Sequence, residues 1–155
     1  MRRLVTVLTM AWLTGCASAP VGPVAGAESP DAAVRGFLAA ARGNDMRGLA
    51  AVWGNAESPV RDRAKSAEVE QRAMIIICHL RHDQATLGMP QSGQAGRQLI
   101  PVDLTQGDRT ARTTFTTVQN AKTGRWFVED VGLAPVAAFC GNNRRSDPIN
   151  IPSVR

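Results

Sequence analysis

Apolar residues recur at the spacing of one helix face from residue 34 onward. Val34, Phe37, Leu38 and Ala41 form an i, i+3, i+4, i+7 series, which predicts an amphipathic helix. Ser29 stands before this series and can accept a hydrogen bond from the first turn, so we expect the helix to begin there. The same spacing returns in a second set of four residues, Met46, Leu49, Ala50 and Trp53. The two sets predict a helical hairpin whose apolar faces can meet each other and a sheet.

A third helix is expected over residues 65–80, although its apolar end is ambiguous. Residues 61–72 are charged with mixed sign, and Glu68 stands four residues before Arg72, as on an exposed helix face. Residues 73–78 then read Ala-Met-Ile-Ile-Ile-Cys, and β-branched side chains favour a strand. Because the polar lead-in favours a helix already under way, we interpret the whole segment as helix.

Beyond His82 the pattern becomes that of strands separated by turns. Thr-rich and β-branched runs are bounded by Gly and Asn residues, and the short links between them indicate an antiparallel meander. The expected strands are 84–89, 98–105, 110–119 and 125–131, followed by a short helical segment at 135–139. The fold class is therefore predicted as α+β, with a helical hairpin and a third helix packed on an antiparallel sheet of about four strands.

The start of the chain has the pattern of an export signal that ends in a cysteine. Arg2 and Arg3 precede an apolar run that is too short to span a bilayer, and small residues follow it. The sequence from Leu13 to Cys16, Leu-Thr-Gly-Cys, resembles the lipobox of bacterial lipoproteins. This resemblance implies cleavage before Cys16 and attachment of lipid to that cysteine. The alternative is an ordinary signal peptide with an incidental cysteine.

The lipoprotein resemblance and the local composition set the expected organisation of the chain. We expect a signal peptide at 1–15, a lipidated tether rich in Pro and Gly at 16–28, a domain at 29–140 and a disordered tail at 141–155. The resemblance implies a location in the cell envelope. Because Ala17 rather than Asp follows the cysteine, it further implies the outer membrane, facing the periplasm, if the source has two membranes.

Charge narrows the expected partners. The chain has 18 basic and 13 acidic residues, and loss of Arg2 and Arg3 with the signal lowers its formal charge from +5 to +3. The remaining basic residues form no single block, so nucleic acid is not an expected partner. The expected partner is the membrane, through the lipid on Cys16, together with an envelope protein or a small apolar ligand. No cofactor is predicted.

The order of the predicted elements resembles the NTF2-like, or cystatin-like α+β, superfamily. The features that carry this resemblance are the capped opening helix with Phe37, the Gly-Asn-Asp break at 43–45 and the closing strand at 124–131. The resemblance implies a strongly curved sheet that forms a cone. It assigns no catalytic residues, because some members of this superfamily are enzymes and others only bind ligands or partners.

Two cysteines besides Cys16 are expected to pair. Cys78 lies near the end of the predicted third helix and Cys140 near the end of the domain, and exported proteins fold in an oxidising compartment. We therefore predict a disulfide between Cys78 and Cys140, with two separate buried thiols as the alternative. Cys78 and His82, four residues apart, could instead share a zinc ion. A disulfide removes that ligand, so no metal is predicted.

Acid–base chemistry would need a histidine close to a carboxylate. The histidines are His79 and His82, and the candidate carboxylates are Asp83, Asp103 and Asp130. Strand alternation places Asp103 away from the apolar face of its strand and Asp130 on the apolar face of the closing strand. Asp130 is therefore the better candidate, although turn or surface carboxylates without a catalytic role are the alternative. No catalytic residue is assigned.

Four aromatic residues are the candidates for an apolar ligand pocket, namely Phe37, Trp53, Phe115 and Trp126. Such residues also fill ordinary cores. The expected function is a membrane-anchored, non-enzymatic binding module of the cell envelope. The alternative is an NTF2-like enzyme with His/Asp acid–base chemistry inside the cone, and a third hypothesis is a structural accessory of an envelope complex.

Overall fold

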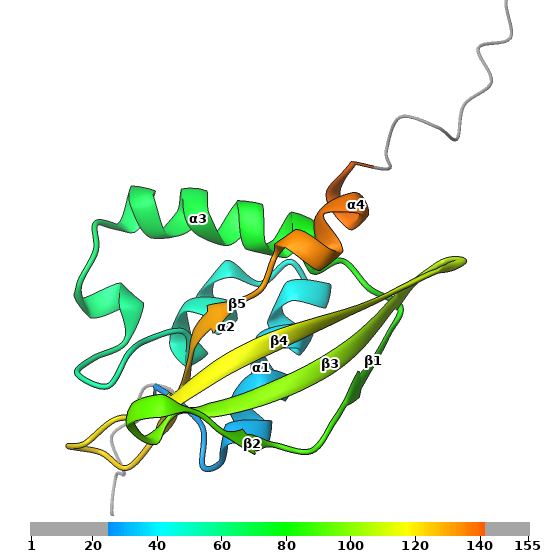
Figure 1. Ribbon diagram of the computed structural model, residues 1–155. Helices are drawn as coiled ribbons and strands as arrows, with labels where there is room; N and C mark the ends of the chain where they lie inside the picture. Colours follow the sequence, from blue (N-terminus) through cyan, green and yellow to red (C-terminus); the bar gives the residue numbers. More distant parts are fainter. Residues whose placement is uncertain (1–24, 142–155) are drawn as a thin grey trace, which may run out of the picture.

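The computed structural model describes residues 25–141, which form an α+β domain (Figure 1). Within these residues there are four α-helices and an open antiparallel sheet of five strands. The predicted signal peptide with Cys16, most of the predicted tether and the tail from residue 142 onward lie outside the described residues. No helix in the 25–141 range is both long enough and apolar enough to cross a membrane.

The domain opens with the predicted helical hairpin, formed by α1 (Pro30–Arg42) and α2 (Met46–Val52). Ser29 Oγ accepts a hydrogen bond of 3.1 Å from a backbone N–H of the first turn and caps α1, as its sequence predicts. Asn44 turns the chain with a positive φ of 54°, a conformation that Asn tolerates better than most residues. Asp45 Oδ1 then accepts a hydrogen bond of 2.9 Å and caps α2.

The third predicted helix is confirmed by α3 (Ser66–His79), which follows a short 3-10 turn, η1 (Val60–Asp62). Within its ambiguous apolar end, Ile76 and Ile77 are buried whereas Met74 is 56% exposed. Burial therefore follows the 3.6-residue period of a helix rather than the two-residue period of a strand. The polar lead-in was the informative signal in this segment.

The predicted antiparallel meander is also confirmed. The strands are β1 (Gln84–Leu87), β2 (Gln91–Ser92), β3 (Gln98–Gln106), β4 (Arg109–Gln119) and β5 (Trp126–Val131). Their order across the sheet is β1-β3-β4-β5, and β2 pairs with one end of β3 after the chain leaves β1. The sequence did not predict β2 or the 3-10 turn η2 (Gln94–Gly96) that follows it, because two exposed polar residues carry no alternation.

The described chain ends in two short helical turns, η3 (Ala134–Val136) and α4 (Ala137–Cys140), where the sequence predicts a helical segment. Cys140 on α4 and Cys78 on α3 lie at disulfide-bonding distance, with their Cα atoms 4.9 Å apart. The predicted cysteine pair is therefore present and joins α4 to α3.

The core lies between the helices and one face of the sheet (Figure 1). The rings of Phe37 on α1 and Phe115 on β4 meet edge to face, with centroids 6.0 Å apart. Aliphatic side chains from α1, α2, α3, β3 and β5 join them in the core, including Val34, Leu49, Ile77, Ile100, Leu104 and Val128. The space between α1 and the sheet is thus filled by side chains.

A β-bulge changes which face of β5 each residue occupies. Thr116 pairs with Asp130, and the next residue of β4 pairs with Val128, so Glu129 is an extra residue on β5. Because directly paired residues share a face, Asp130 lies with Thr116 on the face away from the core, and it is exposed. The prediction that alternation places Asp130 on the core face is therefore wrong.

The chain joins the domain before the predicted boundary at residue 29. The backbone N–H of Gly26 donates to the carbonyl of Ala51 at 2.8 Å. Ala27 exchanges two backbone hydrogen bonds of 2.8 Å with Trp126, the first residue of β5. The last residues of the predicted tether therefore extend the sheet beside β5.

Candidate functional site

A groove of about 360 Å³ runs between α1 and β1. Along α1 it is lined by Arg35, Leu38, Ala39 and Arg42, whose i, i+3, i+4, i+7 spacing puts them on one helix face. Along β1 it is lined by Ala85 and Leu87, which share a strand face because they are two residues apart. The floor of the groove is therefore apolar, and an arginine stands toward each end of its helical wall.

The groove lies beside an open edge of the sheet. Gly88 donates its backbone N–H to Pro101 at 2.7 Å, so Gly88 faces β3. In an antiparallel ladder, alternate residues face the neighbouring strand. The backbone N–H and C=O groups of Ala85 and Leu87 consequently point away from β3. On that side of β1, residues 25–141 form no further strand. Figure 1 shows β1 at this margin of the sheet.

The charge of the groove is positive. Arg42 Nη2 donates to the backbone carbonyl of Asp83 at 2.5 Å. Among the ion pairs found within residues 25–141, none includes Arg35 or Arg42. Both guanidinium groups therefore keep donors that can bind carboxylates.

A second cavity of about 400 Å³ adjoins the groove at the C-terminal end of α1. Arg42 and His82 line both cavities, so the two are neighbours. His82 is buried, and its Nδ1 lies 2.7 Å from the Leu80 carbonyl. Because a carbonyl only accepts, Nδ1 carries the proton in this contact and Nε2 is left as an acceptor in the neutral ring. Gln106 Oε1, on the wall of the same cavity, is buried without a hydrogen-bond partner.

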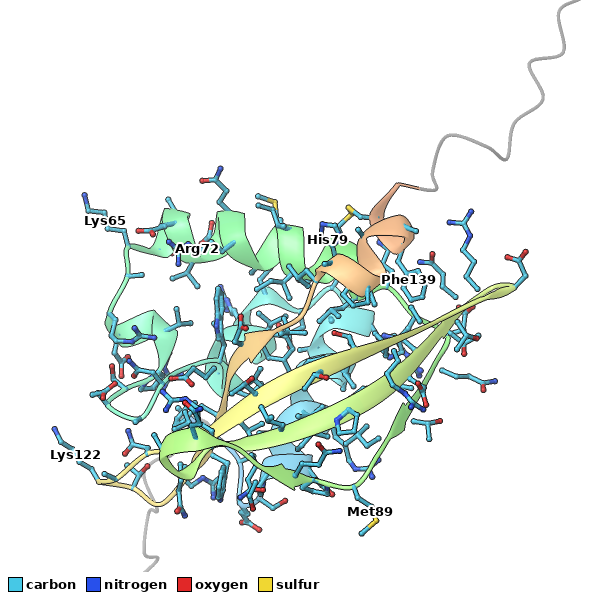
Figure 2. The ribbon with its side chains drawn as sticks, viewed as in Figure 1. Lys65, Arg72, His79, Met89, Lys122 and Phe139 are labelled. Atoms are coloured by element: carbon cyan, nitrogen blue, oxygen red, sulfur yellow. A yellow bond between two sulfur atoms is a disulfide. The ribbon has the colours of Figure 1, made fainter. Side chains whose placement is uncertain are left out.

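The histidines and carboxylates that the sequence offered for acid–base chemistry do not converge. The Asp83 carboxylate accepts a hydrogen bond of 2.7 Å from the backbone N–H of Gly107, in the β3–β4 turn, rather than one from His82. His79 lies on α3 beside α4 (Figure 2), with a buried Nδ1 that has no partner. Across residues 25–141, no group of three or more His, Cys, Asp or Glu side chains is placed to hold a metal ion.

Asp103 lies on the face of the sheet opposite the core, as alternation predicts. The Arg112 guanidinium donates two hydrogen bonds of 2.7 Å to the Asp103 carboxylate and holds the pKa of that carboxyl below its ordinary value. On the same face, the Arg97 guanidinium pairs with Glu129, the extra residue of the bulge. Arg97 and Arg112 are thus each paired with a carboxylate, whereas no ion pair found within residues 25–141 includes Arg35 or Arg42 of the groove at β1.

The four aromatic pocket candidates do not line one ligand-sized cavity. Phe37 and Phe115 are in the core, where they are 1% and 0% exposed. Trp53 and Phe37 border a cavity of only about 100 Å³ at the β5 edge, below the 300–1,000 Å³ typical of ligand pockets. Trp126 is half-buried where Ala27 joins β5.

A larger groove of about 910 Å³ lies between α2 and α3. Its floor is apolar, with Met46, Ala50, Val69 and Ala73, but its rim carries both signs of charge, including Asp45, Arg47, Arg61 and Glu70. The mixed rim gives this groove no clear preference for a charged partner. Sequence reasoning missed both grooves, although the seven-residue spacing of Arg35 and Arg42 on one helix face is visible in the sequence.

The fold and the site define an α+β domain with a cationic groove beside a free strand edge. Comparison of the chain with protein-family models, with curated proteins and with solved structures gives no match.

Proposed function

We propose that this chain is an exported lipoprotein whose NTF2-like domain is a non-enzymatic binding module of the cell envelope. The observation that carries the proposal is the Cys78–Cys140 pair at disulfide-bonding distance. Disulfides persist in exported proteins and are rare in reducing compartments. The lipobox-like sequence from Leu13 to Cys16 supplies the matching export signal and the attachment point for lipid.

The NTF2-like assignment is supported by the order of the elements. A helical hairpin and a third helix precede an antiparallel sheet and cover one of its faces. The location we propose is the membrane surface, reached through lipid on Cys16, and the outer membrane facing the periplasm if the source has two membranes.

Binding is favoured over catalysis by the interior of the domain. Phe37 and Phe115 fill the space where a superfamily enzyme would hold its reacting groups. Residues 25–141 instead offer open grooves at the surface, between α1 and β1 and between α2 and α3. An open surface groove suits a partner protein or an elongated ligand better than a small substrate that must be enclosed.

The anchor is tested by expressing the full chain in a two-membrane bacterium with radiolabelled palmitate. The wild-type chain should take up label and fractionate with membranes. The Cys16→Ser variant should lose the label and retain its signal sequence, whereas the neighbouring Ser18→Ala variant should behave as wild type. An unlabelled, soluble wild-type chain would overturn the lipid anchor.

Binding is tested separately, by affinity purification of the labelled wild-type chain from detergent-solubilised membranes and by native mass spectrometry of residues 17–155. A stoichiometric protein partner or a bound mass supports the binding module. Turnover of a substrate that depends on His82 would overturn the non-enzymatic proposal.

A further inference from the structure

The edge of β1 combines two features that are complementary to an extended peptide. The backbone N–H and C=O groups of Ala85 and Leu87 point outward from the sheet, and such a row pairs with an added strand. The face of α1 that carries Arg35 and Arg42 stands beside the same edge. A strand added at β1 would therefore lie along this helix face.

We propose that the groove between α1 and β1 binds an extended acidic segment of a partner protein by strand addition. The main chain of the segment pairs with Ala85 and Leu87, and its carboxylates bind Arg35 and Arg42. This inference deepens the proposed binding function, on which it rests, by naming the surface and the chemistry of the partner.

The spacing of the arginines fits a strand. Seven residues of helix separate Arg35 from Arg42, which is about 10 Å at 1.5 Å per residue. On one face of a strand, residues two and four apart are separated by roughly 7 and 13 Å. The flexible arginine side chains cover this difference, so a segment with acidic residues at alternate positions can reach both. The apolar side chains of Leu38, Ala85 and Leu87 line the groove between them.

Repulsion between like charges argues against a second copy of this chain as the occupant of the groove. Two β1 edges paired around a two-fold axis would bring the Arg35 and Arg42 side chains of both copies to one seam, and like charges across a pair are unfavourable. An anionic membrane surface satisfies the arginines but offers no row of alternating amide donors and acceptors to the edge of β1. An acidic peptide offers carboxylates to the two arginines and main-chain donors and acceptors to the edge of β1.

The test uses residues 17–155, oxidised, which contain the complete core. The probe is fluorescein-labelled Gly-Glu-Val-Glu-Val-Glu-Val-Gly, followed by fluorescence anisotropy, and the same peptide with Lys in place of Glu is the charge control. The protein variant is Arg35→Glu/Arg42→Glu. The matched control, Lys65→Glu/Lys122→Glu, changes the net charge equally at two side chains that project from the opposite end of the domain (Figure 2).

We expect the Glu peptide to bind and the Lys peptide to bind at least tenfold more weakly. The Arg35→Glu/Arg42→Glu variant should lose at least tenfold in affinity, and the Lys control variant should stay within about twofold of wild type. N-methylation of the probe at one set of alternate residues should abolish binding, and N-methylation at the other set should spare it. Only pairing with a strand edge distinguishes the two sets.

Three results would overturn the proposal. The first is equal affinity of wild type and the Arg35→Glu/Arg42→Glu variant for the Glu peptide. The second is an equal response to both N-methylated sets, which would leave only a general anion site. The third is no peptide binding together with arginine-dependent binding to vesicles of phosphatidylcholine and phosphatidylglycerol, or with self-association. None of these affects the palmitate and fractionation results, so failure of the groove and failure of the anchor are distinguishable.

Discussion

Removal of the Cys78–Cys140 bridge should destabilise the domain by about 4 kcal/mol. The two cysteines are 62 residues apart in the sequence, and the chain-entropy relation gives roughly this value for a closed loop of that length. Small domains have a free energy of unfolding of about 5–15 kcal/mol in total. The bridge would therefore supply a large part of the stability, by restricting the unfolded chain.

The measurement is urea unfolding of residues 17–155 with and without reductant, followed by the fluorescence of Trp53 and Trp126. With a slope of about 2 kcal/mol per molar urea, reduction should lower the midpoint by roughly 2 M. The Cys78→Ser/Cys140→Ser variant should unfold at the midpoint of the reduced wild type. Because both cysteines are half-buried, the serines themselves should add little.

The control is the double-serine variant with reductant, whose midpoint should not move. A loss of less than about 1 kcal/mol on reduction of the wild type would refute the reasoning. It would mean either that the thiols are not joined or that the unfolded chain is already restricted in other ways.

Three further perturbations address packing, the outer face and a turn. Phe115→Ala should destabilise the domain by about 3–5 kcal/mol in the same urea assay, because it empties a fully buried site in contact with the ring of Phe37. A loss under about 1 kcal/mol would contradict a packed interior. The pKa of Asp103 is lower in the folded state than in the unfolded chain, because the Arg112 guanidinium binds its carboxylate. The pair therefore stabilises the fold at pH values above the ordinary carboxyl pKa of about 3.9. This stabilisation is lost as the pH falls through the lower pKa of the folded state. In NMR titrations Arg112→Ala should raise that pKa, and an unchanged value would exclude the pair in solution. Gly54→Ala should lower the free energy of unfolding by about 1–3 kcal/mol in the urea assay, because the added Cβ would stand 2.9 Å from a ring carbon of Phe127 and from the Ser58 carbonyl oxygen. The control is Gly141→Ala, which should leave the stability unchanged because open space surrounds that position.

The helices and the meander could be predicted because their signals are local. The periodicity of α1 and its cap at Ser29 depend only on neighbouring residues, and so does the polar lead-in of α3. The position of Asp130 depends on pairing between strands. The bulge at Glu129 can be recognised only when the pairing of β5 with Thr116 on β4 is known. No local pattern in the sequence of β5 predicts it.

The candidate site could not be predicted from the sequence, because it too depends on how distant elements pack together. The sequence shows that Arg35 and Arg42 share a helix face and that Ala85 and Leu87 share a strand face. The predicted meander leaves β1 at the margin of the sheet, but the sequence does not show that this face of α1 packs beside the same margin. The aromatic residues predicted a pocket in the interior, but Phe37 and Phe115 fill the core there.

The position of the groove is consistent with a domain held by its N-terminus. The chain enters the fold at Gly26 and Ala27, beside β5. The groove lies along β1, at the other edge of the β1-β3-β4-β5 order, and three strand spacings of about 4.8 Å separate the two edges. If lipid on Cys16 holds the chain at the membrane, the entry point of the chain and the groove between α1 and β1 are then at opposite edges of the sheet. A partner can add a strand at β1 without displacing the residues that connect the domain to its anchor, so anchoring and binding should be separable by mutation.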